Sequence, residues 1–532
     1  MKRIIQSLAL VSLCSGLIVM MVVARQSANS VRGRTDAPLP EMSAAPQAIP
    51  TPIPSVTADL PYIVPLSSRP KGLTPQQSRP WFDDFSWQSF IALNWPAKLG
   101  PDGTPLRGVP DTSKSIGDPG PRVWESWKTD YELFQEGGEP PSAWSSYDVV
   151  DPPCHISKAR GATTPLRLKL LPLVAKGGSV LPGSVNQAMG GPLIDQHGKA
   201  ARYEIHLNQS YYDFVKNNQL YLQKNLPQYP KPKLDLPTSQ QGSYGVIEIK
   251  AAWREMSAAE MNDPAITSRY YITQALVIDP GGGNQCRQTN VGLVGMHIAH
   301  KTSPFVQWVW ATFEHVDNVP ETTPAPPGGY SFNNGTPSPP PNQFGYAPGN
   351  AWRPLDATKP LPTTPTQVIR INPVPPSTHS LNMIVQGLAG IQGTVWQHYK
   401  LINTQWPIDP DLPVIVNNPG TANDAYPQGS GNPTPDAQES PGSPNEGVAN
   451  ITMETYFQKV FPPLKLFGSS CMHCHYQAAQ TDFSWVIVDM AYPRNPQAGT
   501  PTPAQRKLAR PPTAPPGATT LQAPRGRRRS PR

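Results

Sequence analysis

Apolar and polar positions recur along this chain with two different periods, and the period changes at about residue 190. Before that point, aromatic residues fall three to four positions apart in WFDDFSWQSFIALNWP (81–96) and VWESWKTDYELF (123–134). This spacing predicts two short amphipathic helices. Their aromatic stripes could form a cage around a cofactor, but packing against other elements is the commoner use of such a face. We therefore assign them to the core.

From Gly191 onward, alternation of apolar and polar residues dominates. Residues 191–209 alternate around His197-Gly198-Lys199, which predicts a β-hairpin. Further strands are expected where β-branched and aromatic residues gather, at 242–256, 269–279, 289–318 and 393–407. Short helices are expected at 210–223, 378–391 and 452–461. The pattern predicts an α+β protein: mainly antiparallel strands with short aromatic-rich helices packed on them.

Proline divides the chain into parts, because 69 of its 532 residues are proline, against a usual ~5%. The C-terminal part that precedes the last proline-rich stretch has under about 50 residues, too few for a core of its own, so we expect it to pack on the body. The predicted parts are a signal peptide or N-terminal anchor (1–24), a Pro/Ser/Ala-rich linker (25–80), an α+β body (81–407) with a Pro-rich loop at about 320–365, a low-complexity loop (408–447), a helical C-terminal segment (448–492) and a disordered basic tail (493–532).

The first residues have the composition of an export signal. Lys2 and Arg3 precede an almost unbroken apolar run from Ile4 to Val23, and small residues end this run before Arg25. This order predicts a secretory signal peptide, although a run near the ~20 residues of a membrane span also fits an uncleaved anchor. In either case the body is expected outside the cytoplasm, in the periplasm or an equivalent compartment. No later segment has the apolar length of a membrane span.

The net charge of +7 comes from the end of the tail, after Pro503, where eight residues are basic and none is acidic. The residues before it carry a formal charge of −1, so the body has no basic face that would indicate a nucleic-acid partner. A basic tail could attract acidic partners or lipid headgroups, but a solvated tail is the simpler interpretation. The eight basic residues are Arg506, Lys507, Arg510, Arg525, Arg527, Arg528, Arg529 and Arg532.

The motif with the clearest chemistry is Cys471-Met472-His473-Cys474-His475, a C-x-x-C-H pattern typical of c-type haem attachment. Two thiols three positions apart can each form a thioether to a haem vinyl group, and the histidine that follows can bind the iron. A zinc site would need a second ligand pair, and a redox dithiol would follow a strand of a βαβ unit. The sequence shows neither, so we predict one covalent haem c.

Two further cysteines, Cys154 and Cys286, are left once Cys14 is assigned to the signal. An oxidising compartment allows them to form a disulfide. The alternative is a pair of separate buried thiols.

Several segments occur in one order: DFSWQSFIALNWP, VWESWK, IEIKAAWR, GLVGMHIAHKT, WVWATFEHVDN, TQWP, METYFQ and SCMHCH. Together, from Trp81 to Trp485, they resemble a group of exported bacterial proteins described as cytochrome c family proteins. The resemblance implies an extracytoplasmic mono-haem protein whose haem follows a large non-haem body, with Cys471, Cys474 and His475 as its transferable residues. It implies no defined reaction.

The sixth ligand of the iron decides the chemistry, because a second strong ligand favours electron transfer and an open iron permits reactions with small molecules. The sequence offers Met490, Met296, His297 and His300 as candidates without choosing between them. His297 and His300 could alternatively join Glu314-His315-Val316-Asp317-Asn318 in a non-haem metal site. A strand end whose polar groups bond to the next loop is the commoner explanation of such a cluster.

Three functions are open at this point. The first is a periplasmic electron-transfer protein that docks a redox partner protein. The second is a haem-linked oxidoreductase with its substrate between the body and the haem, which the large body in front of one attachment site would explain. The third is a haem-bearing binding or sensor protein. The sequence contains no catalytic constellation that would identify an enzyme.

Overall fold

A computed structural model describes residues 52–65, 75–135, 137–147, 169–171, 192–227, 234–240, 242–278, 286–303, 308–321, 324–337, 361–406, 448–458, 471 and 475–493. The predicted signal peptide, the loop 408–447, residues 494–532 of the tail and Cys154 lie outside these residues. None of the helices in these ranges is long and apolar enough to cross a membrane.

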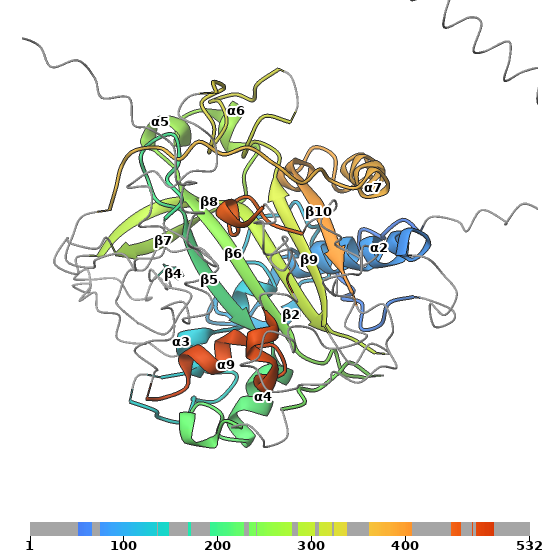
Figure 1. The fold of residues 1–532 in the computed structure, drawn as a ribbon, viewed down its shortest axis with the longest axis vertical. Coiled ribbons are helices and arrows are strands. Elements are labelled where there is room, and N and C mark those ends of the chain that lie inside the picture. The colour runs from blue at the N-terminus through green and yellow to red at the C-terminus, as the bar shows by residue number, and fades with distance from the viewer. Residues whose placement is uncertain are drawn as a thin grey trace, which may run out of the picture. The chain divides into compact units, whose positions relative to one another are not determined.

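An eight-stranded sheet forms the centre of the fold (Figure 1). Its main path runs β10-β9-β8-β6-β5-β3, while β7 pairs with β8 and β4 pairs with β7. All neighbours are antiparallel except β4 and β7, which are parallel. The strands are β3 (Lys128–Thr129), β4 (Lys169–Leu171), β5 (Arg202–Leu207), β6 (Ile247–Glu255), β7 (Ile272–Ile278), β8 (Cys286–Lys301), β9 (Trp308–His315) and β10 (Tyr399–Gln405). The predicted α+β class is confirmed.

Helices cover the sheet and its ends. The longest, α2 (Pro75–Leu93), packs on β8 and β10 and beside α7 (Pro376–Gln386). A two-stranded sheet of β1 (Ala97–Leu99) and β2 (Pro105–Pro110) follows α2. The other helices are α3 (Asp130–Leu133), α4 (Gln209–Asn217), α5 (Ala258–Met261), α6 (Pro264–Thr267) and α9 (Trp485–Met490), with 3-10 turns η1 (Trp124–Ser126), η2 (Gln223–Asn225), η3 (Val395–His398), η4 (Thr455–Phe457) and η5 (Tyr476–Thr481).

The aromatic stripe of α2 lies in the main core, as predicted. Trp87 and Phe90 are fully buried and pack on Phe313 of β9, with ring centroids 5.1 and 4.3 Å away. The aromatic stripe of α2 is therefore buried against the sheet. Since each of these rings removes a large apolar surface from water, this contact is a principal source of stability.

The strand registers assign each residue of β8 and β9 to one face of the sheet. Ala299 pairs with Trp310 and Lys301 pairs with Trp308, so these four side chains share one face. Met296, Ile298 and His300 alternate with them and face α2, where Met296 and Ile298 join the cluster of Trp87 and Phe90, and the His300 ring lies 5.4 Å from Phe85. We call the face with Trp308 and Trp310 the tryptophan face.

The helix predicted over residues 123–134 is wrong. Trp127 has an extended backbone, and the next two residues pair with β5 as strand β3. Thr129 then caps a new one-turn helix, because its hydroxyl accepts from the Glu132 amide and the Glu132 carboxylate accepts from the Thr129 amide. Hydrogen bonding to the sheet edge and a local capping box thus outweigh the helical spacing.

The predicted linker is too long at its C-terminal end. Helix α2 begins at Pro75, six residues before the predicted start of the body, and includes Pro80. The buried Arg79 side chain donates to Asn403 of β10, which ties this first part of the helix to the sheet. Residues 52–65 also contact the body, since Val64 is fully buried in a cluster with Phe82.

The helix predicted over residues 452–461 is also wrong in its described part. Residues up to 458 form a turn and the short η4, and residues 459–461 lie outside the described ranges. The backbone and side chains here bond to the sheet instead of to a helical neighbour, as detailed below. The other predicted helices, at 210–223 and 378–391, are present as α4 and α7 with shorter bounds.

Candidate haem-attachment site

The segment 475–493 packs on the body at one end of the sheet. Phe483, Val486, Ile487 and Met490 are buried in one apolar cluster with residues of α3, α4 and the tryptophan face. In Figure 1, α9 lies beside α3 and α4. Cys471 is half-buried against the same cluster. The first cysteine and the histidine of the motif are thus both at this end of the sheet, and Cys474 lies outside the described residues.

His475 is oriented by a hydrogen bond to the backbone. Its Nδ1 donates to the carbonyl oxygen of Phe483 at 2.7 Å. In the neutral imidazole this bond fixes the proton on Nδ1 and leaves the lone pair on Nε2, which is the arrangement found in metal-binding histidines. The His475 ring also lies 4.4 Å from the ring of Trp310, centroid to centroid, with the two planes 50° apart. The imidazole is therefore positioned on one side by a carbonyl and on another by an indole.

The turn that provides this carbonyl has an unusual backbone. Asp482 and Phe483 have φ values of 54° and 68°, in the left-handed region, which Asp tolerates and a bulky residue such as Phe rarely adopts. The Asp482 carboxylate forms an ion pair with Lys301 and accepts from the Leu236 amide at 2.9 Å. The Asp482 carbonyl accepts from Trp308 Nε1 at 2.8 Å. Contacts with the body therefore stabilise the turn in a backbone conformation that is unfavourable by itself.

Trp310 has a buried donor with no acceptor among the described residues. Only 7% of this residue is exposed, and its Nε1 atom makes no hydrogen bond within the part of the chain that the structure describes. A buried N–H group without an acceptor costs about 1–3 kcal/mol, so buried tryptophans usually have one. This indole lies directly against the ring of His475.

The sheet separates the four candidates for the sixth ligand. Met296 and His300 face α2, on the side away from Trp310. His300 donates from Nε2 to the Tyr244 carbonyl at 2.6 Å, and burial lowers its pKa to about 4, so it is neutral at pH 7. His297 is on the tryptophan face, where its Nε2 lies 3.1 Å from both carboxylate oxygens of Glu454.

Met490 is the other candidate on the side of His475. It lies in α9 and is buried in the apolar cluster that Cys471 contacts. Of the four sequence-derived candidates, Met490 and His297 thus lie on the side of the sheet that carries Trp310. For the three candidates in β8, strand alternation decides the face.

The alternative metal site is not assembled in the described part of the chain. Glu314 and His315 are consecutive strand residues and point to opposite faces. His315 Nε2 lies 2.9 Å from the Arg269 carbonyl, and its Nδ1 accepts from the Asp317 amide. Burial lowers the pKa of His315 to about 3. Among the described residues, no three His, Cys, Asp or Glu side chains are grouped to hold a metal ion.

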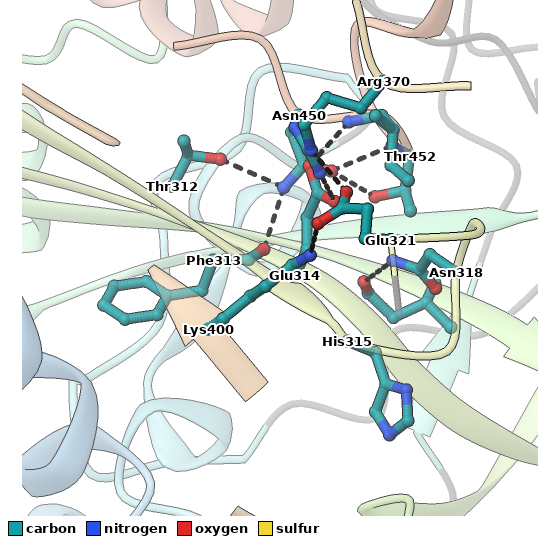
Figure 2. A network of polar contacts seen from close by, with 12 residues as sticks. Thr312, Phe313, Glu314, His315, Asn318, Glu321, Arg370, Lys400, Asn450 and Thr452 are labelled. Carbon is teal, nitrogen blue, oxygen red and sulfur yellow. Dashed lines mark hydrogen bonds and ion pairs between the residues drawn. The ribbon is translucent and has the colours of Figure 1, made fainter. Parts of the chain in front are cut away.

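An ionic network with a buried glutamate lies farther along the tryptophan face of the sheet (Figure 2). Arg370 forms an ion pair with Glu314 of β9 and donates from Nε to Glu321 at 2.6 Å. Lys400 of β10 pairs with Glu321 as well. The Glu314 side chain is fully buried, so removing its partner would leave a carboxylate without compensation.

This network anchors the segment 448–458. The Ile451 amide donates to Glu314 at 2.8 Å, and Asn450 Nδ2 donates to Thr312 Oγ1 at 3.0 Å and to the Phe313 carbonyl at 2.9 Å. Figure 2 shows Asn450 and Thr452 gathered over Thr312 and Glu314. Both described parts of the predicted haem segment, 448–458 and 475–493, therefore rest on the tryptophan face.

Sequence reasoning missed Lys301, Asp482 and Trp310 as members of this site. Lys301 and Asp482 are 181 positions apart, so no local spacing connects them. One signal was available, because a lysine ends the mainly apolar, β-prone run GLVGMHIAHK and a buried lysine needs a partner. Trp310 carried no signal beyond its place in a β-prone run.

Comparison of the chain with protein-family models, with curated proteins and with solved structures found no match.

Proposed function

We propose that this chain is an extracytoplasmic mono-haem c-type cytochrome that takes part in electron transfer. Cys471 and Cys474 would hold the haem through thioethers, and His475 would bind the iron through Nε2. The observation that carries the proposal is the bond from His475 Nδ1 to the Phe483 carbonyl, which presents the imidazole in the form that a metal ligand requires. The bound haem would supply a one-electron couple of ferric and ferrous iron.

The described residues fit such a group in three ways. Cys471 lies against an apolar cluster, which suits the hydrophobic edge of a porphyrin. His475 is in the correct tautomer, as argued above. Trp310 has a buried N–H donor without an acceptor among the described residues, and haem carries two carboxylates that accept such bonds. Of these three features, the unpartnered donor of Trp310 is the one that costs free energy if nothing binds there.

Two residues that would complete the iron site on the same side of the sheet are Met490 and His297. With either of them as a second protein ligand to the iron, the haem would supply outer-sphere electron transfer as its natural chemistry. The proposed haem segment packs on the body and does not form a separate domain, since α9 packs on α3, α4 and the sheet. A redox partner protein would then dock on a surface built partly by the body.

The test is a visible spectrum of the purified, haem-loaded protein, oxidised and reduced, with and without carbon monoxide. A pyridine haemochrome typical of two thioethers and a low-spin spectrum indifferent to carbon monoxide support the proposal. A high-spin spectrum that shifts with carbon monoxide would contradict the electron-transfer role and favour an oxidoreductase. Absence of covalent haem after expression with a haem-attachment system would overturn the assignment.

A further inference from the structure

A buried ion pair lies directly behind the turn that bonds to His475. Lys301 ends strand β8, and both its side chain and that of Asp482 have 0% exposure. Lys301 Nζ also lies 2.7 Å from Asp235, whose side chain is 81% exposed. One lysine therefore contacts two carboxylates, one buried in the site and one in solvent.

A buried ion pair contributes little net stability, because desolvation of both charges offsets most of their attraction. Apolar residues of similar size often serve as well or better. Here the pair is combined with a second cost, the left-handed backbone of Asp482 and Phe483. Two costs at one turn, next to the proposed iron ligand, indicate that the conformation of this turn matters to the site.

We propose that Lys301 is a positioning residue for His475. Through Asp482 it holds the turn in place, the turn presents the Phe483 carbonyl, and the carbonyl fixes the orientation and protonation of the imidazole. Two neutral contacts share the task, from the Leu236 amide and from Trp308 Nε1. This inference rests on the proposed function, since its purpose is the strength of the bond between His475 and iron.

The chemistry follows from the hydrogen bond on Nδ1. A carbonyl that accepts this proton strongly makes the imidazole a better electron donor at Nε2 and keeps its plane from rotating. If the ion pair is removed, the turn can relax toward an ordinary backbone conformation and withdraw the carbonyl. The bond from Nε2 to iron should then weaken, while the fold around the apolar cluster persists.

The decisive variant is the double substitution Lys301→Met with Asp482→Asn. Lys301→Met alone would leave Asp482 charged and buried, which can unfold the protein for a reason unrelated to haem. The double variant removes both charges and keeps the size of both side chains. The matched control is Asp235→Asn, which alters the solvent-exposed partner of the same lysine.

The first measurement is an acid titration of the oxidised, haem-loaded protein, followed by visible absorbance and far-UV circular dichroism together. Loss of an outer-shell partner weakens metal binding by about 10–100-fold. The double variant should therefore lose His475 ligation at a pH at least about one unit higher than the parent, before the dichroism changes. Asp235→Asn should titrate like the parent. Equal midpoints for the parent and the double variant would overturn the inference.

A second measurement uses the haem-free protein, prepared as the Cys471→Ala, Cys474→Ala background. The ¹⁵N chemical shifts of His475 report which ring nitrogen carries the proton. The parent background should show the proton on Nδ1, and addition of Lys301→Met with Asp482→Asn should produce a mixture of both tautomers. An unchanged Nδ1–H tautomer would count against the inference. If the wild-type chain carries no covalent haem, the proposed function fails, and this measurement still tests the positioning role by itself.

Discussion

The imidazole of His475 and the backbone carbonyl of Phe483, eight residues apart, are joined by a 2.7 Å hydrogen bond. The bond closes a tight loop around η5 and gives the histidine a fixed direction. A histidine in a solvated turn would have no need of such a bond. Its presence connects the C-x-x-C-H motif to a specific backbone conformation, and the predictions below start from this connection.

His475→Ala should leave haem covalently attached through the two cysteines and should abolish the native axial ligation. The reason is that the thioethers do not depend on the iron, whereas the strong proximal bond does. The visible spectrum of the reduced protein should change from low-spin to high-spin. His473→Ala, inside the same attachment turn, is the matched control and should keep the parent spectrum. Identical spectra for His475→Ala and the parent would refute the assignment.

Cys471→Ala should reduce covalent attachment to a single thioether. Only Cys474 would then react with a vinyl group, so the second vinyl stays unsaturated and in conjugation with the ring. The pyridine haemochrome band should move to longer wavelength, and denaturing gels should still show a haem-staining band at lower yield. Cys14→Ala, in the predicted export signal, should change neither. A parent-like haemochrome in Cys471→Ala would contradict the role of this thiol.

Trp310→Phe should affect the haem-loaded and haem-free proteins differently. The ring packing is largely kept, but the Nε1 donor is removed. If haem supplies the missing acceptor, the loaded protein should lose about 1.5–3 kcal/mol of unfolding free energy more than the haem-free protein, the usual net value of a hydrogen bond to a charged group. Denaturant unfolding of both forms measures the difference.

Trp396→Phe is the control for this experiment. Its Nε1 already donates to the Ile116 carbonyl at 2.8 Å, in the core on the other face of the sheet. Its removal should therefore destabilise the loaded and haem-free proteins by similar amounts. If the two tryptophan variants behave alike, the donor of Trp310 has no partner that arrives with haem.

The sequence predicted the architecture where one physical signal dominated. A high content of β-branched and aromatic residues identified the long strands β6, β8 and β9, and helical spacing and cap signals identified parts of α2, α4 and α7. It failed at 123–134, where Trp124 and Trp127 stand at helical spacing but belong to a turn and an extended residue. Pairing of Lys128 with β5 decided the outcome, and such pairing is a property of the tertiary fold.

Some residues of the candidate site could likewise be predicted from the sequence, and others could not. Cys471, Cys474 and His475 lie within five positions of the chain, so the haem prediction could be made from their spacing alone. Lys301, Trp310 and Asp482 meet only because β8, β9 and the C-terminal segment pack together. Contacts between residues so distant in sequence depend on strand register. No single-sequence pattern encodes that register with enough detail to predict side-chain partners.

His300→Gln should reduce the loss of stability in mild acid. Burial lowers the pKa of His300 from 6.5 to about 4, so the unfolded chain binds a proton between these values and the folded chain does not. Acidification therefore favours unfolding: the stability from this group is complete above pH 6.5 and is lost as the pH falls to about 4. The loss from one such group is about 3 kcal/mol.

Urea unfolding of the protein at several pH values between 7 and 4 tests this prediction. The variant should show a shallower decline than the parent, by about that amount across the range. Other buried histidines, such as His315, will preserve part of the slope. His197→Gln is a suitable control, because 44% of that side chain is exposed. Parallel curves for the parent and His300→Gln would show that this histidine is protonated without cost in the folded state.

Gly295→Ala should loosen the segment 448–458 from the sheet. A Cβ at this position would lie 2.2 Å from Thr452 Oγ1 and 3.1 Å from Asn450 Oδ1. Overpacking of this kind costs about 1–3 kcal/mol, and the strain falls on the segment that precedes the haem motif. Thr452→Ala removes the clashing oxygen, so the double variant should recover part of the lost stability, whereas adding Thr452→Ser should not. Hydrogen exchange at the Ile451 amide, which donates to Glu314, should quicken in Gly295→Ala and slow again in the rescued variant. Without that rescue, the clash with Thr452 is not the cause.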